Sequence, residues 1–510
     1  MMILDCTLRD GGYYTNWDFD RPLVDLYLES FNLLPVDYLE IGYRSKFLDN
    51  YLGEYFYCPP YVLERVRRLS NKKIAVMLNE KDTEPEVLDE VLSPCNGFID
   101  LVRLAVNPVN FARALKLAGM IKDRGFQVGF NLMYMSTWKN DEGTLSLMPD
   151  VEGKVDYLNL VDSYGGIYPD EVRQTIEAVK NRTNVKIGFH GHNNLELGLI
   201  NALTAVECGA EIVDATVTGM GRGAGNLKTE LLLTALNRKA GLSVDFSALG
   251  NIVNAFQELQ KEFQWGTNLP YMISGANSLP QKDVMNWVTA RFYSFNSIIR
   301  ALQNQKIGIE DNQKLKLFKP QNEFSKAVII GGGPNANIHS TAVKEFIQRE
   351  SDICVIHASS KNASNYKDLN LQQYFCLVGN EGHRLEKIFD DLGTFDGYCV
   401  LPPFPRKMGT YIPQAVKNKC FELASVEFIE KLNDTHTVIA LQTAISLGVK
   451  NVFLVGYDGY NSSVISNMEQ QLFSENELIF SKARKVLDIV SLVPTQYSIP
   501  ITSVYSLLFR

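Results

Sequence analysis

The first half of the chain contains eight short apolar runs rich in Val, Ile and Leu, each followed by an amphipathic or loop segment. The runs occupy residues 2–6, 38–42, 74–78, 98–104, 127–132, 157–161, 186–189 and 212–217. Runs of this length that alternate with helical segments are typical of βα units around a parallel sheet. Eight such units within residues 1–245 favour a closed (β/α)8 barrel, a TIM barrel, over an open sheet.

Polar side chains stand at the carboxyl ends of several runs, where barrel enzymes carry their chemistry. They are Arg9, Asp10, Glu40, Asp162, Ser163, His190 and His192. Two histidines at i and i+2 of a strand point to the same side, so His190 and His192 can reach one divalent ion, with Asp10 as a third ligand. Such a facial triad leaves positions open for an oxygen-rich substrate. The alternative is a pair of histidines at a solvated strand end.

A glycine-dense loop, residues 219–226, follows the eighth run and leads into a helical stretch at residues 228–239. Glycines allow positive φ and let backbone N–H groups approach an anionic ligand closely, so we expect Gly221 and Gly223 to line a substrate site. A tight βα turn explains the same residues. Ser163, after the sixth run, is the third residue that we expect to bind substrate.

The remaining sequence predicts a helical extension and a second α/β domain. Residues 246–317 show helix-like apolar spacing and either pack on the barrel or form a homodimer face, and the polar residues 309–322 read as a linker. An apolar run at residues 327–330 then feeds Gly331, Gly332 and Gly333, the opening of a Rossmann-like nucleotide-binding fold, although the full G-x-G-x-x-G fingerprint is absent. The expected domains are residues 1–245, 246–322 and 323–510.

Further elements of this second domain are expected at strands 353–357, 374–378, 398–401 and 451–455, with a helix at residues 437–447. The last strand ends in Gly456-Tyr457-Asp458-Gly459. We expect Asp458 to meet a sugar hydroxyl or a metal-bound phosphate of a nucleotide held by the three glycines, or else to belong to an ordinary turn.

Composition narrows the functional class. The net charge of −8 gives no reason to expect nucleic acid or an anionic membrane as a partner. No apolar run approaches the roughly 20 residues of a membrane span, and the N-terminus enters a strand pattern without a signal-peptide pattern. Eight cysteines without C-x-x-C spacing suggest neither a zinc knuckle nor a disulfide framework, so a cytoplasmic protein is expected.

With the barrel in register, four motifs at four strand ends resemble the DRE-TIM metallolyase superfamily, and within it the 4-hydroxy-2-oxovalerate aldolases. They are Leu4-Asp5-Cys6-Thr7-Leu8-Arg9-Asp10-Gly11-Gly12, Asp162-Ser163-Tyr164-Gly165-Gly166, Gly188-Phe189-His190-Gly191-His192-Asn193-Asn194 and Gly219-Met220-Gly221-Arg222-Gly223-Ala224-Gly225-Asn226. The resemblance implies Mn²⁺ or Mg²⁺ held by Asp10, His190 and His192, with Asn226 as a fourth ligand by motif position. It implies that Arg9 takes up enolate charge, and we expect Glu40 and Asp162 to orient Arg9 or a metal-bound water.

Two departures from the superfamily pattern bear on the reaction. Gly11 replaces the eponymous Glu, as it does in the aldolase branch. Tyr13 replaces the aldolase histidine that acts as general base, so Tyr13, Tyr14 or a metal-bound hydroxide would have to move the proton. The strand-eight loop also lacks the cysteine of hydroxymethylglutaryl-CoA lyases. We therefore expect an aldolase that joins or separates a 2-oxo acid, most simply pyruvate, and an aldehyde.

Other functions stay open at this stage. An acyl-CoA-condensing synthase of the isopropylmalate or homocitrate kind is the alternative within the superfamily, and an inactive barrel that carries a C-terminal transferase is an alternative outside it. A metal-dependent amidohydrolase is disfavoured, because its H-x-H pair belongs to the first barrel strand. The C-terminal domain resembles the Rossmann-like domains of bacterial motility-accessory and sialyltransferase-related glycosyltransferases, which implies a nucleotide sugar and a role in surface-polysaccharide synthesis.

Overall fold

The computed structural model describes residues 1–49, 51–290, 295–308, 314–320, 322–379, 381–389, 392–406, 411–430, 432, 434–460 and 467–508. The chain forms two compact units, Met1–Asn286 and Trp287–Arg510. Both are α/β structures with parallel strands. Among the described residues, no helix combines the length and the apolar character needed to cross a membrane.

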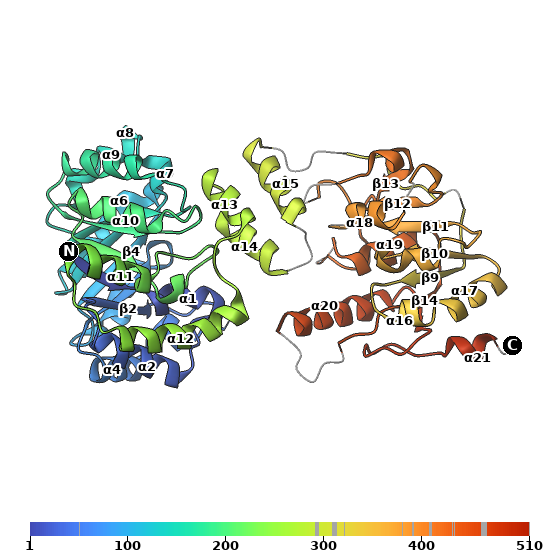
Figure 1. The fold of residues 1–510 in the computed structure, drawn as a ribbon, viewed down its shortest axis with the longest axis horizontal. Helices are drawn as coiled ribbons and strands as arrows, with labels where there is room; N and C mark the ends of the chain where they lie inside the picture. The colour runs from blue at the N-terminus through green and yellow to red at the C-terminus, as the bar shows by residue number, and fades with distance from the viewer. Residues whose placement is uncertain are drawn as a thin grey trace. The chain divides into compact units, whose positions relative to one another are not determined.

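The first unit is built on a closed barrel of eight parallel strands (Figure 1). These are β1 (Met2–Asp5), β2 (Tyr38–Tyr43), β3 (Lys73–Asn79), β4 (Leu101–Val106), β5 (Gln127–Leu132), β6 (Tyr157–Asp162), β7 (Lys186–Gly191) and β8 (Ile212–Ala215). The barrel closes through β1 and β8, where Leu4 pairs with Asp214. The expected barrel is confirmed. The fourth strand begins three residues later than expected, because Phe98 and Ile99 close a turn on the carbonyl of Cys95.

Helices surround the barrel. The principal ones are α1 (Thr7–Thr15), α2 (Arg21–Asn32), α4 (Pro60–Leu69), α5 (Leu88–Leu92), α6 (Phe111–Lys122), α9 (Pro169–Lys180), α10 (Gly198–Glu207) and α11 (Thr229–Ala240), with the short α3 (Glu54–Tyr57), α7 (Met135–Trp138) and α8 (Glu142–Leu145) between them. Their apolar faces and the outward faces of the strands form one buried core. Local signals fix the ends: α9 begins with Pro169 followed by Asp170 and Glu171, residues that suit a helix N-terminus.

The predicted helical extension consists of α12 (Phe246–Phe263), α13 (Leu269–Ala276), α14 (Gln281–Ala290) and α15 (Phe295–Lys306). Asp245 caps α12 by accepting backbone N–H groups of Ser247 and Ala248. Phe256 of α12 is fully buried beside Tyr27 of α2, so α12 covers its own barrel. Of the expected linker, residues 309–313 and 321 lie outside the described residues, and Phe318 donates its N–H to the carbonyl of Glu422.

The barrel interior changes character along its axis. The N-terminal end is closed by a small apolar cluster that includes Leu4, Tyr38 and Leu101. The next layer contains the fully buried Arg103, which fits because Gly129 stands opposite it, where a Cβ would come within 2.7 Å of the Arg103 Cγ. A barrel of this size is normally filled by apolar side chains. A charged side chain in this layer therefore needs partners of opposite charge, which are described with the active site below.

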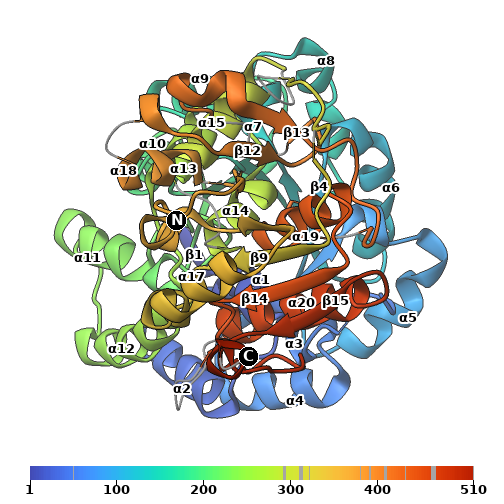
Figure 2. The same ribbon diagram turned by 90° about the vertical axis from the view of Figure 1, so that its right-hand side faces the viewer.

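The second unit is a seven-stranded parallel sheet of order β13-β12-β11-β10-β9-β14-β15 (Figure 2). Its strands are β9 (Lys326–Ile330), β10 (Ile353–His357), β11 (Gln373–Cys376), β12 (Tyr398–Leu401), β13 (Cys420–Glu422), β14 (Asn451–Val455) and β15 (Asp488–Ser491), and its helices are α16 (Asn335–Ile338), α17 (Ser340–Arg349), α18 (Glu381–Ile388), α19 (His436–Ser446), α20 (Asn467–Ala483) and α21 (Val504–Leu508). Alternate residues of β9 enter two cores, one shared with α19 and one with α17. Both faces of the sheet are thus covered, as in a doubly wound fold.

Candidate active site

Three potential metal ligands converge at the carboxyl end of the barrel. Asp10 lies in α1, directly after β1, and His190 and His192 lie at and just beyond the end of β7. One ligand atom from each residue lies within 4.8 Å of those from the other two. Asp10 and His190 are buried, with 2% and 3% of their surface exposed. A carboxylate and two imidazoles in this geometry suit a divalent cation with open positions for substrate.

Hydrogen bonds fix how both histidines face this site. His190 Nδ1 lies 2.8 Å from Asp214 Oδ2, and His192 Nδ1 lies 2.9 Å from the carbonyl oxygen of Asp162. Each contact occupies Nδ1, so Nε2 of each ring is the atom left for a cation. His190 Nε2 lies 3.7 Å from Asp10 Oδ2. The ligand set is therefore held in place by the protein.

The side chain of Asn226 gives independent support for a cation-binding site. Its Nδ2 donates to Asp10 Oδ2 at 2.5 Å, while its Oδ1 is buried with no hydrogen-bond partner among the described residues. A buried carbonyl oxygen without a partner is costly, and coordination of a cation would satisfy it. Gly221 makes room for this amide, because a Cβ there would lie 2.5 Å from Asn226 Nδ2. The residues present thus fit a divalent cation.

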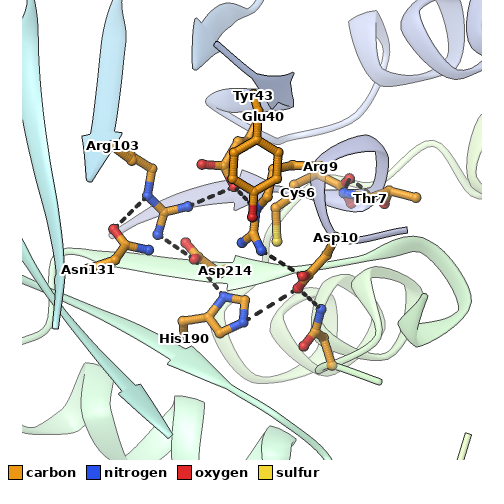
Figure 3. Close-up of polar contacts among 12 residues, drawn as sticks. Cys6, Thr7, Arg9, Asp10, Glu40, Tyr43, Arg103, Asn131, His190 and Asp214 are labelled. Carbon is orange, nitrogen blue, oxygen red and sulfur yellow. Dashed lines mark hydrogen bonds and ion pairs between the residues drawn. The ribbon is translucent and has the colours of Figure 1, made fainter. Parts of the chain in front are cut away.

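A network of buried charges supports the ligands from beneath (Figure 3). Arg9 donates from Nη1 to Asp10 Oδ1 at 2.6 Å and from Nε to Glu40 Oε2 at 2.8 Å. Arg103 donates from Nη1 to Glu40 Oε2 at 3.3 Å and from Nη2 to Asp214 Oδ2 at 2.5 Å. The chain of contacts runs from Asp10 through both arginines to Asp214, and from there to His190, so the two ends of the network are ligands of the same site.

Sequence reasoning missed Arg103 and Asp214. Both lie inside apolar runs, Leu101-Val102-Arg103-Leu104 and Ile212-Val213-Asp214-Ala215. A charge flanked by apolar residues in a strand that is covered on its outer face has to point into the barrel, where it needs a partner of opposite sign. That pattern was present in the sequence and could have identified both residues.

The electrostatics of the site favour an ionised Asp10 and a neutral His192. Burial raises the pKa of the Asp10 carboxyl, but the Arg9 guanidinium and the two imidazoles outweigh burial and lower that pKa to about 2. Burial and the neighbouring His190 lower the pKa of His192 to about 3. Burial opposes the charge of Arg9, yet Asp10 and Glu40 raise its pKa above the ordinary value. A carboxylate and neutral imidazoles are the protonation states that bind metals.

Tyrosines occupy the place of the expected general base. Tyr13 is 37% exposed, and its hydroxyl lies 3.4 Å from that of the buried Tyr43. Burial raises the pKa of Tyr43 well above its ordinary value. The Arg222 guanidinium lies 5.4 Å from the centre of the Tyr13 ring. Tyr14, the other tyrosine considered, donates its hydroxyl to the carbonyl of Gly223 and does not line the pocket.

Of the other residues expected at the site, some line the pocket and others only shape the loops around it. The Ser163 hydroxyl accepts the N–H of Tyr134 and lines the pocket. The Asp162 carboxylate accepts the N–H groups of Gly166 and Ile167, so it organises its own loop, while its carbonyl contacts His192. Gly223 has a φ of +68°, a conformation that favours glycine, and neither it nor Gly221 lines the pocket.

The ligands open into a pocket of about 350 Å³ at the mouth of the barrel. All eight strand ends contribute to its walls, from Arg9 and Asp10 after β1 to Arg222 after β8. Glu40 is fully buried, is not part of the pocket lining, and contacts the pocket-lining Arg9. A site of this size can hold a small metabolite.

The C-terminal unit has a pocket of its own, about 520 Å³ in volume. It lies at the carboxyl ends of β9 and β14, where the strand order reverses, and its walls include Gly331, Gly332, Gly333 and Asp458. The N–H groups of Gly331 and Gly333 donate to the carbonyls of Val455 and Gly456, and that of Asn335 donates to Asp458 Oδ2. These glycines therefore allow β9 and β14 to approach closely.

Comparisons with known proteins agree on the first unit. A family model described as HMGL-like matches residues 107–255. The 4-hydroxy-2-oxovalerate aldolase of Chloroflexus aurantiacus is 30% identical over 241 residues, which cover 46% of this chain and 69% of that protein. The oxaloacetate decarboxylase of Mycobacterium tuberculosis is 26% identical over 253 residues, 48% of this chain and 71% of that protein.

A solved structure extends the similarity. The crystal structure of the N-terminal domain of a candidate aldolase from Bacteroides vulgatus is 56% identical to this chain, with a TM-score of 0.57. The match covers 59% of this chain and 100% of that domain. All of these similarities are to proteins or domains that match only part of this chain.

Proposed function

Because the chain belongs to the HMGL-like family, we propose that its barrel is a divalent-metal-dependent aldolase that acts on a 2-oxo acid and an aldehyde. The observation that carries the proposal is the convergence of Asp10, His190 and His192 beside a pocket that Arg9 also lines. Pyruvate is the simplest 2-oxo acid, and Mn²⁺ or Mg²⁺ is the proposed cation. The proposed ligands are these three residues with Asn226.

A bound divalent cation supplies Lewis-acid polarisation of the keto oxygen of the 2-oxo acid. Arg9 stabilises the negative charge that develops on that oxygen when a C–C bond breaks or a C3 proton leaves. Glu40 and Asp10 occupy Nε and Nη1 of Arg9, and no acceptor for Nη2 is found among the described residues. Nη2 is therefore the proposed donor to substrate, and Glu40 positions the guanidinium rather than contacting substrate.

Tyr13 and Tyr43 are proposed to move the proton of the aldehyde-derived hydroxyl. With its pKa raised by burial, Tyr43 stays a neutral phenol at pH 7. A neutral phenol is a poor base, but two phenols in contact can relay a proton, each accepting one proton while donating another. The exposed Tyr13 hydroxyl is the end of this relay that substrate can reach.

Deuterium exchange into C3 of pyruvate, followed by NMR, tests the enolate chemistry without knowledge of the aldehyde. We expect exchange that requires Mn²⁺ or Mg²⁺ and falls at least about 1,000-fold in His190→Ala, since loss of a ligand removes the electrostatic stabilisation of the enolate. Asp150→Asn, an exposed position in the same unit, is the matched control. Absence of exchange in folded, metal-loaded protein would reject pyruvate as the donor.

Two competing reactions would use the same site: decarboxylation of oxaloacetate gives the pyruvate enolate, whereas in condensation with an acyl-CoA the thioester forms the enolate and the 2-oxo acid is the electrophile. Oxaloacetate decarboxylation is suggested by the Mycobacterium tuberculosis relative, and condensation with an acyl-CoA is the synthase alternative. Incubation with oxaloacetate, or with pyruvate and acetyl-CoA, separates them, because carbon dioxide release and free CoA are measured directly. Turnover of either exceeding that of every aldehyde would replace the aldolase proposal.

A second candidate function concerns the C-terminal unit, which we propose binds a nucleotide or nucleotide sugar. The supporting observation is the pocket at the carboxyl ends of β9 and β14, since ligands of open α/β sheets bind where the strand order reverses. The exposed Lys361 and the half-buried Asp458 line it, a cation for phosphate and an acceptor for sugar hydroxyls. Such a ligand would connect the barrel chemistry with surface-polysaccharide synthesis.

Calorimetric titration of the full chain with a panel of nucleotides and nucleotide sugars tests this second function. We expect one of them to bind, with an affinity at least about tenfold lower in Lys361→Glu because the charge near the phosphate is reversed. Lys482→Glu, an exposed position on α20, serves as the control. No heat from any member of the panel would reject the proposal.

A further inference from the structure

The barrel pocket has two chemically different sides. The proposed metal ligands belong to β7, β1 and the loop after β8, and in a closed eight-stranded barrel β3, β4 and β5 stand opposite them. The opposite wall contains Asn79, Lys81, Asn107, Asn110 and Asn131. An aldehyde that meets a 2-oxo acid held beside the ligand residues would therefore face a wall that carries these amides and one ammonium group.

Most hydrogen-bond donors of this wall are unused. Asn131 is 3% exposed, and its Oδ1 accepts from Arg103 Nε and Asn159 Nδ2, whereas no acceptor for its own Nδ2 is found among the described residues. The Oδ1 of Asn107 accepts the N–H of Val109, which again leaves Nδ2 available. Because these contacts fix which amide atom is the oxygen, both free atoms are N–H₂ donors.

Two further groups add to this set of donors. No partner for the side chain of Asn79, at the end of β3, is found within the described part of the chain, and the same holds for the exposed ammonium of Lys81. By contrast, Glu80 is already paired with Arg113 and Asn110. The wall therefore offers donors and a positive charge, and its one carboxylate is neutralised.

We infer that the second substrate of the barrel is a hydroxylated aldehyde with an anionic group at the end remote from its carbonyl. This inference rests on the proposed function. Hydroxyl oxygens would accept from Asn79, Asn107 and Asn131, and the anionic end, a phosphate or a carboxylate, would pair with Lys81. Buried donors aimed into a site are left unpaired by a ligand that lacks oxygens, which is how such a site rejects it.

The size of the pocket agrees with a substrate larger than pyruvate plus acetaldehyde. Its volume of about 350 Å³ equals the share of about a dozen water molecules in the liquid. In the reaction, C3 of pyruvate forms a bond to the aldehyde carbon, the proton lost from C3 balances the one gained by the aldehyde oxygen, and no other reactant is required. The product is a 4-hydroxy-2-oxo acid with a hydroxylated, anionic tail.

Aldol condensation by the metal-loaded full chain tests the inference with pyruvate and acetaldehyde, glyceraldehyde, glyceraldehyde 3-phosphate or glucuronate. We expect kcat/KM for glyceraldehyde to exceed that for acetaldehyde at least about 100-fold, since sites that bind a substrate hydroxyl discriminate strongly against its absence. Glyceraldehyde 3-phosphate or glucuronate should exceed glyceraldehyde, and the better of the two identifies the anion. Acetaldehyde as the best acceptor would overturn the inference.

Variants connect the preference to the wall. Lys81→Met should lower the ratio of kcat/KM for glyceraldehyde 3-phosphate over glyceraldehyde about tenfold, and Asn79→Leu should lower the ratio for glyceraldehyde over acetaldehyde. Lys116→Met, an exposed lysine of α6 outside the pocket, should change neither ratio. Ratios that survive in Lys81→Met and Asn79→Leu would reject the wall as the source of specificity.

Deuterium exchange into pyruvate, measured in each variant, distinguishes failure of the acceptor preference from failure of the donor chemistry. Exchange without the expected aldehyde preference overturns only the inference about the acceptor, whereas absence of exchange rejects pyruvate as the donor, on which both the proposed function and this inference rest. Glycerol 3-phosphate adds a readout that needs no turnover. It should raise the melting temperature of the metal-loaded protein and of Lys116→Met, and a similar rise in Lys81→Met would contradict pairing of the anion with Lys81.

Discussion

The barrel and the C-terminal sheet both carry polar groups at the carboxyl ends of parallel strands, but they bury their charges differently. Arg103 in the barrel is fully buried between Glu40 and Asp214. In the C-terminal pocket Lys361 is exposed, and the side chain of Arg384 is 39% exposed beside Glu381. An uncompensated buried charge is strongly destabilising, so the barrel network must be complete before any substrate arrives. The exposed cations of the C-terminal pocket carry no such requirement.

The largest expected effect follows from removing one member of the barrel network. Arg103→Met leaves Glu40 with Arg9 alone and leaves the buried Asp214 with only the His190 ring beside it, which should lower the free energy of unfolding by about 3–5 kcal/mol. Urea unfolding followed by tryptophan fluorescence measures it, because three of the four tryptophans, Trp17, Trp138 and Trp265, lie in the barrel unit.

Arg384→Met is the matched variant in the other unit. Its solvent-exposed guanidinium should contribute less than about 1 kcal/mol, since Glu381 keeps the N–H of Ser360 and the hydroxyl of Ser359 as donors. Circular dichroism follows the unfolding of both units, and the part of its transition that tryptophan fluorescence does not show belongs to this unit. Equal losses in the two variants would remove the distinction between a buried network and an open pocket.

The C-terminal unit buries the imidazole of His357 completely, and this group should make the stability of the unit sensitive to acid. Burial lowers the pKa of this imidazole to about 4 from a usual 6.5. The unfolded state therefore binds a proton that the folded state resists, and stability falls as the pH drops below 6.5. The loss should reach about 3 kcal/mol at pH 4.

Urea unfolding at pH 7 and pH 4, with circular dichroism as the probe, measures this loss. His357→Gln cannot titrate, so it should remove the contribution of this group to the pH dependence while it keeps a hydrogen-bonding side chain beside Gln373. The same dependence in wild type and variant would assign the acid sensitivity to other groups.

Much of the barrel could be predicted from sequence, whereas the contacts inside it could not. The apolar runs predicted all eight barrel strands, and the strand-end positions of Asp10, His190 and His192 predicted that these side chains would meet, since a barrel gathers its strand ends in one place. Strand β13, Cys420–Glu422, was not predicted because three residues are too few to show a pattern, and β15, Asp488–Ser491, was also not predicted. The pairing of Arg103 with Asp214 depends on register across the barrel interior, which local sequence does not express.

Asp214 gives the smallest change to the barrel network, because among the proposed metal ligands it contacts His190 directly and reaches Asp10 through Arg103, Glu40 and Arg9. Asp214→Asn keeps the shape of the side chain but loses the charge that holds the His190 Nδ1 proton and pairs with Arg103. Removal of such an orienting partner should weaken Mn²⁺ binding about 10–100-fold, or roughly 1.4–2.7 kcal/mol, measured by calorimetric titration of the metal alone. Asp150→Asn should bind Mn²⁺ like the wild type. Unchanged affinity in Asp214→Asn would mean that His190 is oriented by strand β7 itself, and the buried network would then serve the stability of the barrel rather than its metal site.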